Sequence, residues 1–265
     1  MELFFQTWPN LLLIFCRMTS FFVVVPFFSS RNIPTTVKIG LAAFLSFITF
    51  GIVGASNPVP IDSIYVLLIL REILVGVLLG FVIYLFFTAV QIAGAFVDIQ
   101  MGFAIANVID PMTGSSAPML GNMKFMVSLL IFLSFDGHHY LIRAIIDSYQ
   151  WIPLDNELFT RIYNGQISDF LFKSFSTMFY LAFQIGAPLV AAFFLTDLGL
   201  GLLTRVAPQF NVFVVGMPLK MLLGFLLLYL LFPELPSLFQ HLYVTAFDSL
   251  GELIELISKP QPAAP

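Results

Sequence analysis

Residues 73–90 read ILVGVLLGFVIYLFFTAV and carry no charged side chain. A helix needs about 20 mostly apolar residues to cross the hydrocarbon core of a bilayer. Helices in the core of a soluble protein usually keep one polar face, whereas residues 73–90 and 221–232 are apolar all round. These segments therefore predict helices that span a membrane.

The composition of the whole chain supports the same prediction. Of its 265 residues, 59% are hydrophobic and 10% are charged, against roughly 25% charged in ordinary soluble domains. Apolar blocks lie at about 11–28, 39–55, 64–90, 125–146, 171–196 and 212–232. We expect an all-α, polytopic membrane protein built from helical hairpins, with five or six spanning or deeply buried helices, and no soluble enzyme.

Several functional classes find no support in the sequence. The net charge is −4 and there is no basic run, so nucleic-acid binding is not expected. The only cysteine, Cys16, cannot form an intramolecular disulfide. There is no Ser-His-Asp arrangement, phosphate-cradling glycine loop or H-E-x-x-H motif, so we predict no catalytic residue and no cofactor.

The sequence FDGHHY brings Asp136, His138 and His139 close together and invites a metal-site or proton-relay interpretation. Adjacent histidines on a helix point to different faces, and no cysteine or carboxylate cluster surrounds them at ligand spacing. We therefore predict no metal site and expect a hydrogen-bonding role at a helix end.

Polar side chains within or beside the apolar blocks need partners, because an unpaired polar group in lipid costs several kcal/mol. They are Arg17, Arg71, Glu72, Gln91, Asp98, Gln184, Asp197 and Lys220. Gln91 and Asp98 are seven residues apart and share one helix face, which should contact protein or a wet lumen. Asp197 and Lys220 flank one hairpin and either pair across it or meet a partner. We predict inter-helix or inter-subunit polar contacts for these four residues.

Two other features of the apolar blocks are open to two interpretations. For Arg17 and Arg71, near block ends, an internal ion pair or snorkelling explains the charge as well as a functional role does. Gly76 and Gly80 form a small-xxx-small pair that permits close helix contact, although this pattern is common.

Residues 101–123, MGFAIANVIDPMTGSSAPMLGNM, interrupt the series of helices. Their helix-breaking residues are Gly102, Pro111, Gly114, Pro118 and Gly121. The segment is nevertheless too apolar for a loop surrounded by water, and irregular backbone at membrane depth is tolerated only where protein buries it or it lines a cavity. We expect a re-entrant or plug-like element over residues 102–121; a loop resting on the membrane is the alternative.

The last part of the chain shows helical periodicity. The apolar positions are Tyr243, Phe247, Leu250, Ile254 and Ile257, with Asp248, Glu252 and Glu255 elsewhere on the helical wheel. We expect this amphipathic helix to pack on its own protein; an anchor on the membrane surface is the alternative.

Two long motifs resemble a known family. Residues 101–142, MGFAIANVIDPMTGSSAPMLGNMKFMVSLLIFLSFDGHHYLI, are similar to the central region of the FliR family of flagellar type III export-gate proteins and its virulence-system relatives. Residues 196–220, TDLGLGLLTRVAPQFNVFVVGMPLK, resemble the C-terminal hairpin of that family. With the opening helix LLLIFCRMTSFFVVVPFFSSRNIP, the resemblance covers nearly the whole chain.

The resemblance implies a non-enzymatic structural and gating subunit of the flagellar or type III protein export gate. The subunit would form part of the channel through which unfolded substrate proteins cross the cell inner membrane, within the flagellar basal body. The implied partners are the P-type and Q-type gate membrane proteins, the B-type substrate-switching protein, export substrates in transit and membrane lipid.

The resemblance also implies domains and site residues. Residues 1–170 are expected to resemble the P-type partner and to contain plug segment 102–121, residues 171–257 to form a hairpin and amphipathic tail like the Q-type partner, and residues 258–265 to be flexible. The plug residues carried over from the family are Phe103, Ile109, Asp110, Pro111, Met112, Gly114, Pro118, Met119 and Gly121. The residues expected at the cytoplasmic entrance, near the B-type partner, are Arg205, Pro208, Gln209 and Asn211.

A secondary transporter of a small solute is the alternative function, with the solute held among Asp98, Gln100 and Asp110. Such transporters commonly have paired interruptions in two related halves, whereas this sequence has one strong interruption. A membrane-embedded enzyme ranks third, because no catalytic constellation is present. Since the charges and the broken centre fit contacts with other subunits, we expect fewer lipid-facing helices than hydropathy counts.

Overall fold

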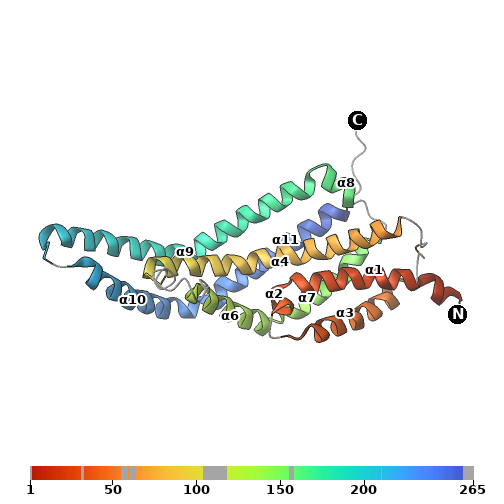
Figure 1. Ribbon diagram of the computed structural model, residues 1–265, viewed down its shortest axis with the longest axis horizontal. Helices are drawn as coiled ribbons and strands as arrows, with labels where there is room; N and C mark the ends of the chain where they lie inside the picture. The colour runs from red at the N-terminus through yellow and green to blue at the C-terminus, as the bar shows by residue number, and fades with distance from the viewer. Residues whose placement is uncertain are drawn as a thin grey trace, which may run out of the picture. The chain divides into compact units, whose positions relative to one another are not determined.

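The structure is a computed structural model that describes residues 2–30, 33–54, 59, 64–103, 118–154, 158–209 and 211–258. Over these residues the chain is helical and has no strand (Figure 1). The α-helices are α1 (Glu2–Val24), α2 (Pro26–Ser29), α3 (Thr35–Thr49), α4 (Tyr65–Met101), α6 (Met119–Ser134), α7 (Gly137–Trp151), α8 (Leu158–Tyr163), α9 (Gln166–Val206), α10 (Val212–Leu231) and α11 (Leu235–Ser258). A π-helical turn, Phe50–Gly54, follows α3, and a 3₁₀ turn, Phe232–Glu234, joins α10 to α11.

Five helical segments in the described part of the chain are long and apolar enough to cross a membrane. They are Thr7–Val24, Thr35–Val53, Tyr65–Met101, Gln166–Val206 and Val214–Ser258. α6 and α7 together meet the same criterion as one broken span, which raises the number to six. The predicted all-α, polytopic membrane fold is therefore confirmed.

The chain divides into two compact units. The first contains Met1–Leu85, Phe135–Phe175 and Val244–Pro265, and the second contains Phe86–Ser134 and Ser176–Tyr243. α4, α9 and α11 each contribute residues to both units. The predicted division at residue 170 concerns likeness to two partner proteins, and it stays a prediction.

In the first unit, α1 packs beside α3 (Figure 1) and makes a close contact with α4. A Cβ atom added to Gly76 would lie 2.0 Å from Ser20 Oγ and 2.3 Å from the carbonyl oxygen of Arg17. A Cβ atom added to Gly80 would lie 3.0 Å from Val24 Cβ. The small-xxx-small pair thus marks a real helix contact, at which the absence of a side chain lets two backbones approach.

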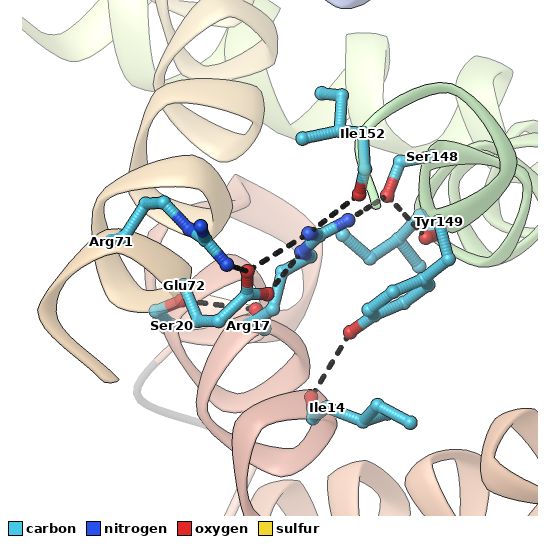
Figure 2. Close-up of polar contacts among 9 residues, drawn as sticks. Ile14, Arg17, Ser20, Arg71, Glu72, Ser148, Tyr149 and Ile152 are labelled. Atoms are coloured by element: carbon cyan, nitrogen blue, oxygen red, sulfur yellow. Dashed lines mark hydrogen bonds and ion pairs between the residues drawn. The ribbon is translucent and has the colours of Figure 1, made fainter. Parts of the chain in front are cut away.

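The same helix contact contains a buried ion pair, shown in Figure 2. Arg17 on α1 donates through Nε to Glu72 Oε2 at 2.6 Å and through Nη2 to Glu72 Oε1 at 3.1 Å. Both side chains are 0% exposed. Arg71 on α4 donates through Nη2 to Glu72 Oε1 at 3.4 Å. The two-pronged contact fits the planar guanidinium to the carboxylate and is stronger than a single neutral hydrogen bond.

The remaining donors of Arg17 reach α7. Nη1 donates to Ser148 Oγ at 3.2 Å, and Nη2 donates to the carbonyl oxygen of Ile152 at 2.9 Å (Figure 2). The guanidinium carbon lies 4.0 Å from the ring centroid of Tyr149, a cation–π distance. Arg17 therefore connects α1, α4 and α7, so the internal ion pair explains the charge at this position.

In the second unit, aromatic side chains of α4, α6 and α11 pack together. The ring centroids of Phe87 and Phe132 are 5.2 Å apart, and those of Phe132 and Tyr243 are 5.0 Å apart. The Tyr243 hydroxyl donates to the Ser128 carbonyl oxygen and lies 3.0 Å from Ser128 Oγ. A buried tyrosine hydroxyl is thereby satisfied without water.

The structure also confirms the predicted amphipathic helix, α11, whose apolar side packs on its own protein. Leu250, Leu253 and Ile257 are buried, whereas Glu252 and Glu255 are exposed. Glu252 pairs with Lys173 of the same unit at 2.9 Å.

We predict that Glu72→Gln destabilises the chain by about 3–5 kcal/mol, because it leaves the buried Arg17 guanidinium without its counter-charge. Thermal unfolding of the purified chain in detergent measures the change. Arg143→Gln is the matched control, since it breaks an ion pair with Asp147 in which the two side chains are 81% and 46% exposed. Equal losses of stability in the two variants would contradict a special role for the buried pair.

Candidate functional site

The predicted plug residues lie at and between two helix ends. Phe103 follows α4, Pro118 precedes α6, and Met119 and Gly121 belong to the first turn of α6. The other predicted plug residues, Ile109, Asp110, Pro111, Met112 and Gly114, lie outside the described residues. The candidate site therefore consists of the end of α4 and the start of α6, which both belong to the second unit.

Asp98 belongs to α4, yet its side chain caps the N-terminus of α6. Its carboxylate accepts hydrogen bonds from the backbone N–H of Leu120, at 3.0 Å to Oδ1 and 3.1 Å to Oδ2. It also accepts one from the N–H of Gly121 at 3.2 Å. The first amides of a helix have no partner within the helix, and a negative charge is favourable at that end. The side chain of Asp98, 4% exposed, satisfies both requirements from a neighbouring helix.

Asp98 also helps to end its own helix. Gly102 adopts a left-handed conformation with φ of 87°, and its N–H donates to the carbonyl oxygen of Ile99 at 3.2 Å. The N–H of Phe103 donates to the carbonyl oxygen of Asp98 at 3.0 Å. These two bonds form a Schellman motif, the common helix ending at which glycine supplies the positive φ. The backbone of Asp98 thus terminates α4 while its carboxylate begins α6.

One turn and two turns before Asp98, α4 touches α6 again. Gln91 Nε2 donates to Asn122 Oδ1 at 2.9 Å. A Cβ atom added to Gly94 would lie only 2.3 Å from Gly121 Cα, so the two backbones are in direct contact. Gln91, Gly94 and Asp98 share one helix face by their spacing, and the structure turns that face toward α6.

The contact between α4 and α6 lies beside an apolar cluster. The buried members are Val97, Met101, Leu120, Leu189 and Phe193. Phe103 packs against this cluster, and its ring centroid lies 6.4 Å from that of Phe225 on α10. Lys124 on α6 is 4% exposed and lies close enough to Asp98 for an electrostatic interaction. The carboxylate of Asp98 is thus bound directly by two backbone amides, and Lys124 lies nearby.

A cavity of about 410 Å³ adjoins the end of α4 within the second unit. Met101 and Gly102 line it together with residues of α9 and α10. Asp197 on α9 and Lys220 on α10 form an ion pair at its wall. This pair connects the two arms of the hairpin, at a cavity that Met101 and Gly102 also line.

The four residues predicted at the entrance surround the turn between α9 and α10. Arg205 lies in the last turn of α9, Pro208 and Gln209 lie in the connecting turn, and all three are exposed. Asn211 is exposed as well, and its Oδ1 accepts the N–H of Val214 at 3.4 Å at the start of α10. The tip of the hairpin is therefore accessible, and it exposes these polar side chains beside apolar ones such as Val206.

The contacts of the candidate site fix the position of one helix end relative to another. Two helix ends are locked to each other by one carboxylate and by a backbone contact, and a 14-residue segment, 104–117, connects them. Sequence reasoning missed Gly94, Asn122 and Lys124 as members of this site. Gly94 was detectable, because it falls between Gln91 and Asp98 on the same helix face.

Comparisons with known proteins identify relatives. The family model described as bacterial export proteins, family 1, matches residues 8–246. Flagellar biosynthetic protein FliR of Bacillus subtilis (strain 168) is 41% identical over 249 residues, which cover 94% of this chain and 96% of the relative. FliR of Escherichia coli (strain K12) is 34% identical over 250 residues, with 93% and 91% covered. Yop proteins translocation protein T of Yersinia pestis is 29% identical over 245 residues, with 92% and 93% covered.

We predict that Gly94→Ala lowers stability by about 1–3 kcal/mol, because its methyl group overlaps the backbone of Gly121 and forces α4 and α6 apart. The matched control is Gly199→Ala on α9, where an added Cβ meets no atom within 4 Å. The control should be neutral or slightly stabilising, since alanine favours helix by up to about 1 kcal/mol over glycine. Thermal unfolding in detergent compares the two, and a tolerated Gly94→Ala would show that the close contact is not needed.

Proposed function

This chain belongs to family 1 of the bacterial export proteins, and we propose that it is a gating subunit of the channel through which unfolded proteins leave the cell. It is a membrane-embedded component of a type III export apparatus, in keeping with relatives named for flagellar biosynthesis and Yop translocation. The channel crosses the inner membrane, within the flagellar basal body. The subunit acts without catalysis and without a cofactor.

The fixed ends of segment 104–117 are the observation that carries the gating proposal. Asp98 binds the amides of Leu120 and Gly121, and Gly94 touches Gly121. Segment 102–121 is too apolar to be a loop in water. A tethered apolar segment can block the passage of ions at rest and yield to a polypeptide in transit. For this to occur, the closed state must be favoured by only a few kcal/mol.

Exposed apolar surface supports the proposal of neighbouring subunits. Within the span Val214–Ser258, only 11% of the most apolar window is buried, against 61% for Tyr65–Met101. Leu222, Phe225 and Tyr229 on α10 are all exposed. We assign these surfaces to contacts with the P-type and Q-type gate proteins and with membrane lipid. The polar turn at Arg205 and Gln209 then faces the cytoplasmic entrance and the B-type partner.

Deleting Gly114–Ala117 tests the plug. The deletion keeps Pro118 and α6, so the subunit should still assemble. A shortened plug should seal poorly, and the ion conductance of the membrane should rise in cells that carry the deletion. Deleting Asp155–Glu157, between α7 and α8, is the control for a shortened connection elsewhere, and conductance should not change. Unchanged conductance with normal protein export in the Gly114–Ala117 deletion would refute the plug.

A mass measurement tests the proposed assembly. The complex extracted gently in detergent should contain this chain together with smaller, different membrane proteins, because an export gate is a hetero-oligomer. A secondary transporter, the alternative function, should be recovered alone or as a homo-oligomer. Recovery of this chain with no other membrane protein would contradict the gate assignment.

A further inference from the structure

Three side chains with metal-binding atoms meet at the start of α7, in the first unit. Asp136, His138 and His139 each offer one ligand atom, and these atoms lie within 4.8 Å of one another. Asp136 Oδ1 is 3.5 Å from His139 Nδ1, and the ring centroids of His138 and His139 are 4.1 Å apart. Two ligands on a tetrahedral zinc ion, at bonds of about 2.0–2.1 Å, are roughly 3.4 Å apart. The spacing of Asp136 and His139 already fits that geometry.

His138 contributes an independent observation. Its Nδ1 atom is buried and has no hydrogen-bond partner. Its ring lies beside that of His139 and 6.4 Å from that of Phe27, centroid to centroid. A buried polar atom without a partner is uncommon in folded proteins, and an ion at the site is one of its recognised explanations. A metal ion bound to Nδ1 would satisfy this atom.

The carboxylate of Asp136 makes no capping hydrogen bond to the backbone, so it is available to bind a metal ion. Asp136 has φ of 55° and ψ of 25°, the only positive φ of a non-glycine residue in the described part of the chain. An aspartate that precedes a helix usually accepts the first amides, yet this side chain makes no capping hydrogen bond. The side chains of Asp136 and His139 are 72% and 71% exposed, so an ion can reach them.

We propose that Asp136, His138 and His139 bind a divalent cation of the zinc type, with a fourth position open to water. Imidazole and carboxylate ligands suit Zn²⁺ in a three-residue site with one open position. The prediction of no metal site assumed that adjacent histidines point to different faces, whereas at the first turn of α7 the two rings lie together. That turn carries a partial positive charge, which opposes a cation, so the charge of Asp136 is essential.

Calorimetric titration with Zn²⁺ tests the site on the full chain, purified in detergent without a polyhistidine tag. The parent chain should bind one Zn²⁺. His138→Gln and His139→Gln each remove a ligand, and Asp136→Asn removes the charge with a residue that tolerates the left-handed backbone. Each should weaken binding by at least about tenfold. His241, the third histidine of the sequence, lies at an exposed position of α11. His241→Gln is the matched control and should bind Zn²⁺ as tightly as the parent chain does.

Cobalt substitution gives a second measurement. Co²⁺ in the parent should show the intense visible absorption of a four-coordinate site, and His138→Gln should abolish it. Circular dichroism must show unchanged helix content in the variants, so that lost binding reports a lost ligand. The absence of Zn²⁺ binding by the parent overturns the proposal, as does binding that persists undiminished in all three variants. The measurement needs no export activity, so its result is independent of the proposed function.

Discussion

Arg17 and Glu72 meet where neither water nor lipid can satisfy a charge, and the packing of the first unit depends on that meeting. Two buried charges are tolerable only when they pair well and when further hydrogen bonds use the remaining donors. Arg17 meets this demand by reaching Glu72 on α4, together with Ser148 and Ile152 at the end of α7. Gly76 makes the reach possible, because a side chain there would collide with the backbone of Arg17. The ion pair of Arg17 with Glu72 and the missing side chain at Gly76 therefore together place α1 against α4.

The same requirement is met differently in the second unit. Asp98 makes no ion pair with an arginine in the described part of the chain, and its carboxylate is bound by the amides that open α6. A helix N-terminus can bind an anion through its free amides and its partial positive charge. One residue therefore ends α4 and begins α6.

Sequence patterns predicted the helices well because the apolar residues must match bilayer thickness whatever the partners are. The shared face of Gln91 and Asp98 followed from spacing. For Asp197 and Lys220 the sequence left two alternatives open, and the structure shows the pairing across the hairpin. The partner of Arg17 did not follow, since Glu72 is 55 residues away and nothing local specifies which helix approaches. The contact of Gly94 with Gly121 was missed for the same reason. At His138 and His139, the rule for neighbours on a regular helix was applied where the helix is only beginning, and the rings lie together instead.

The contrast between polar and apolar groups explains why such a chain is suited to an assembly. Its buried charged side chains, such as Arg17, Glu72 and Asp98, find partners inside the chain, whereas α3 and α10 leave large apolar side chains exposed, among them Phe44, Phe47 and Leu222. The hydrophobic effect does not favour contact of an apolar surface with protein over contact with lipid. Neighbouring subunits must therefore be recognised by their shape and by the few polar groups that stay exposed. Substitutions at the internal polar contacts therefore act on folding, while substitutions on the exposed faces act on assembly, and the two classes can be separated experimentally for this reason.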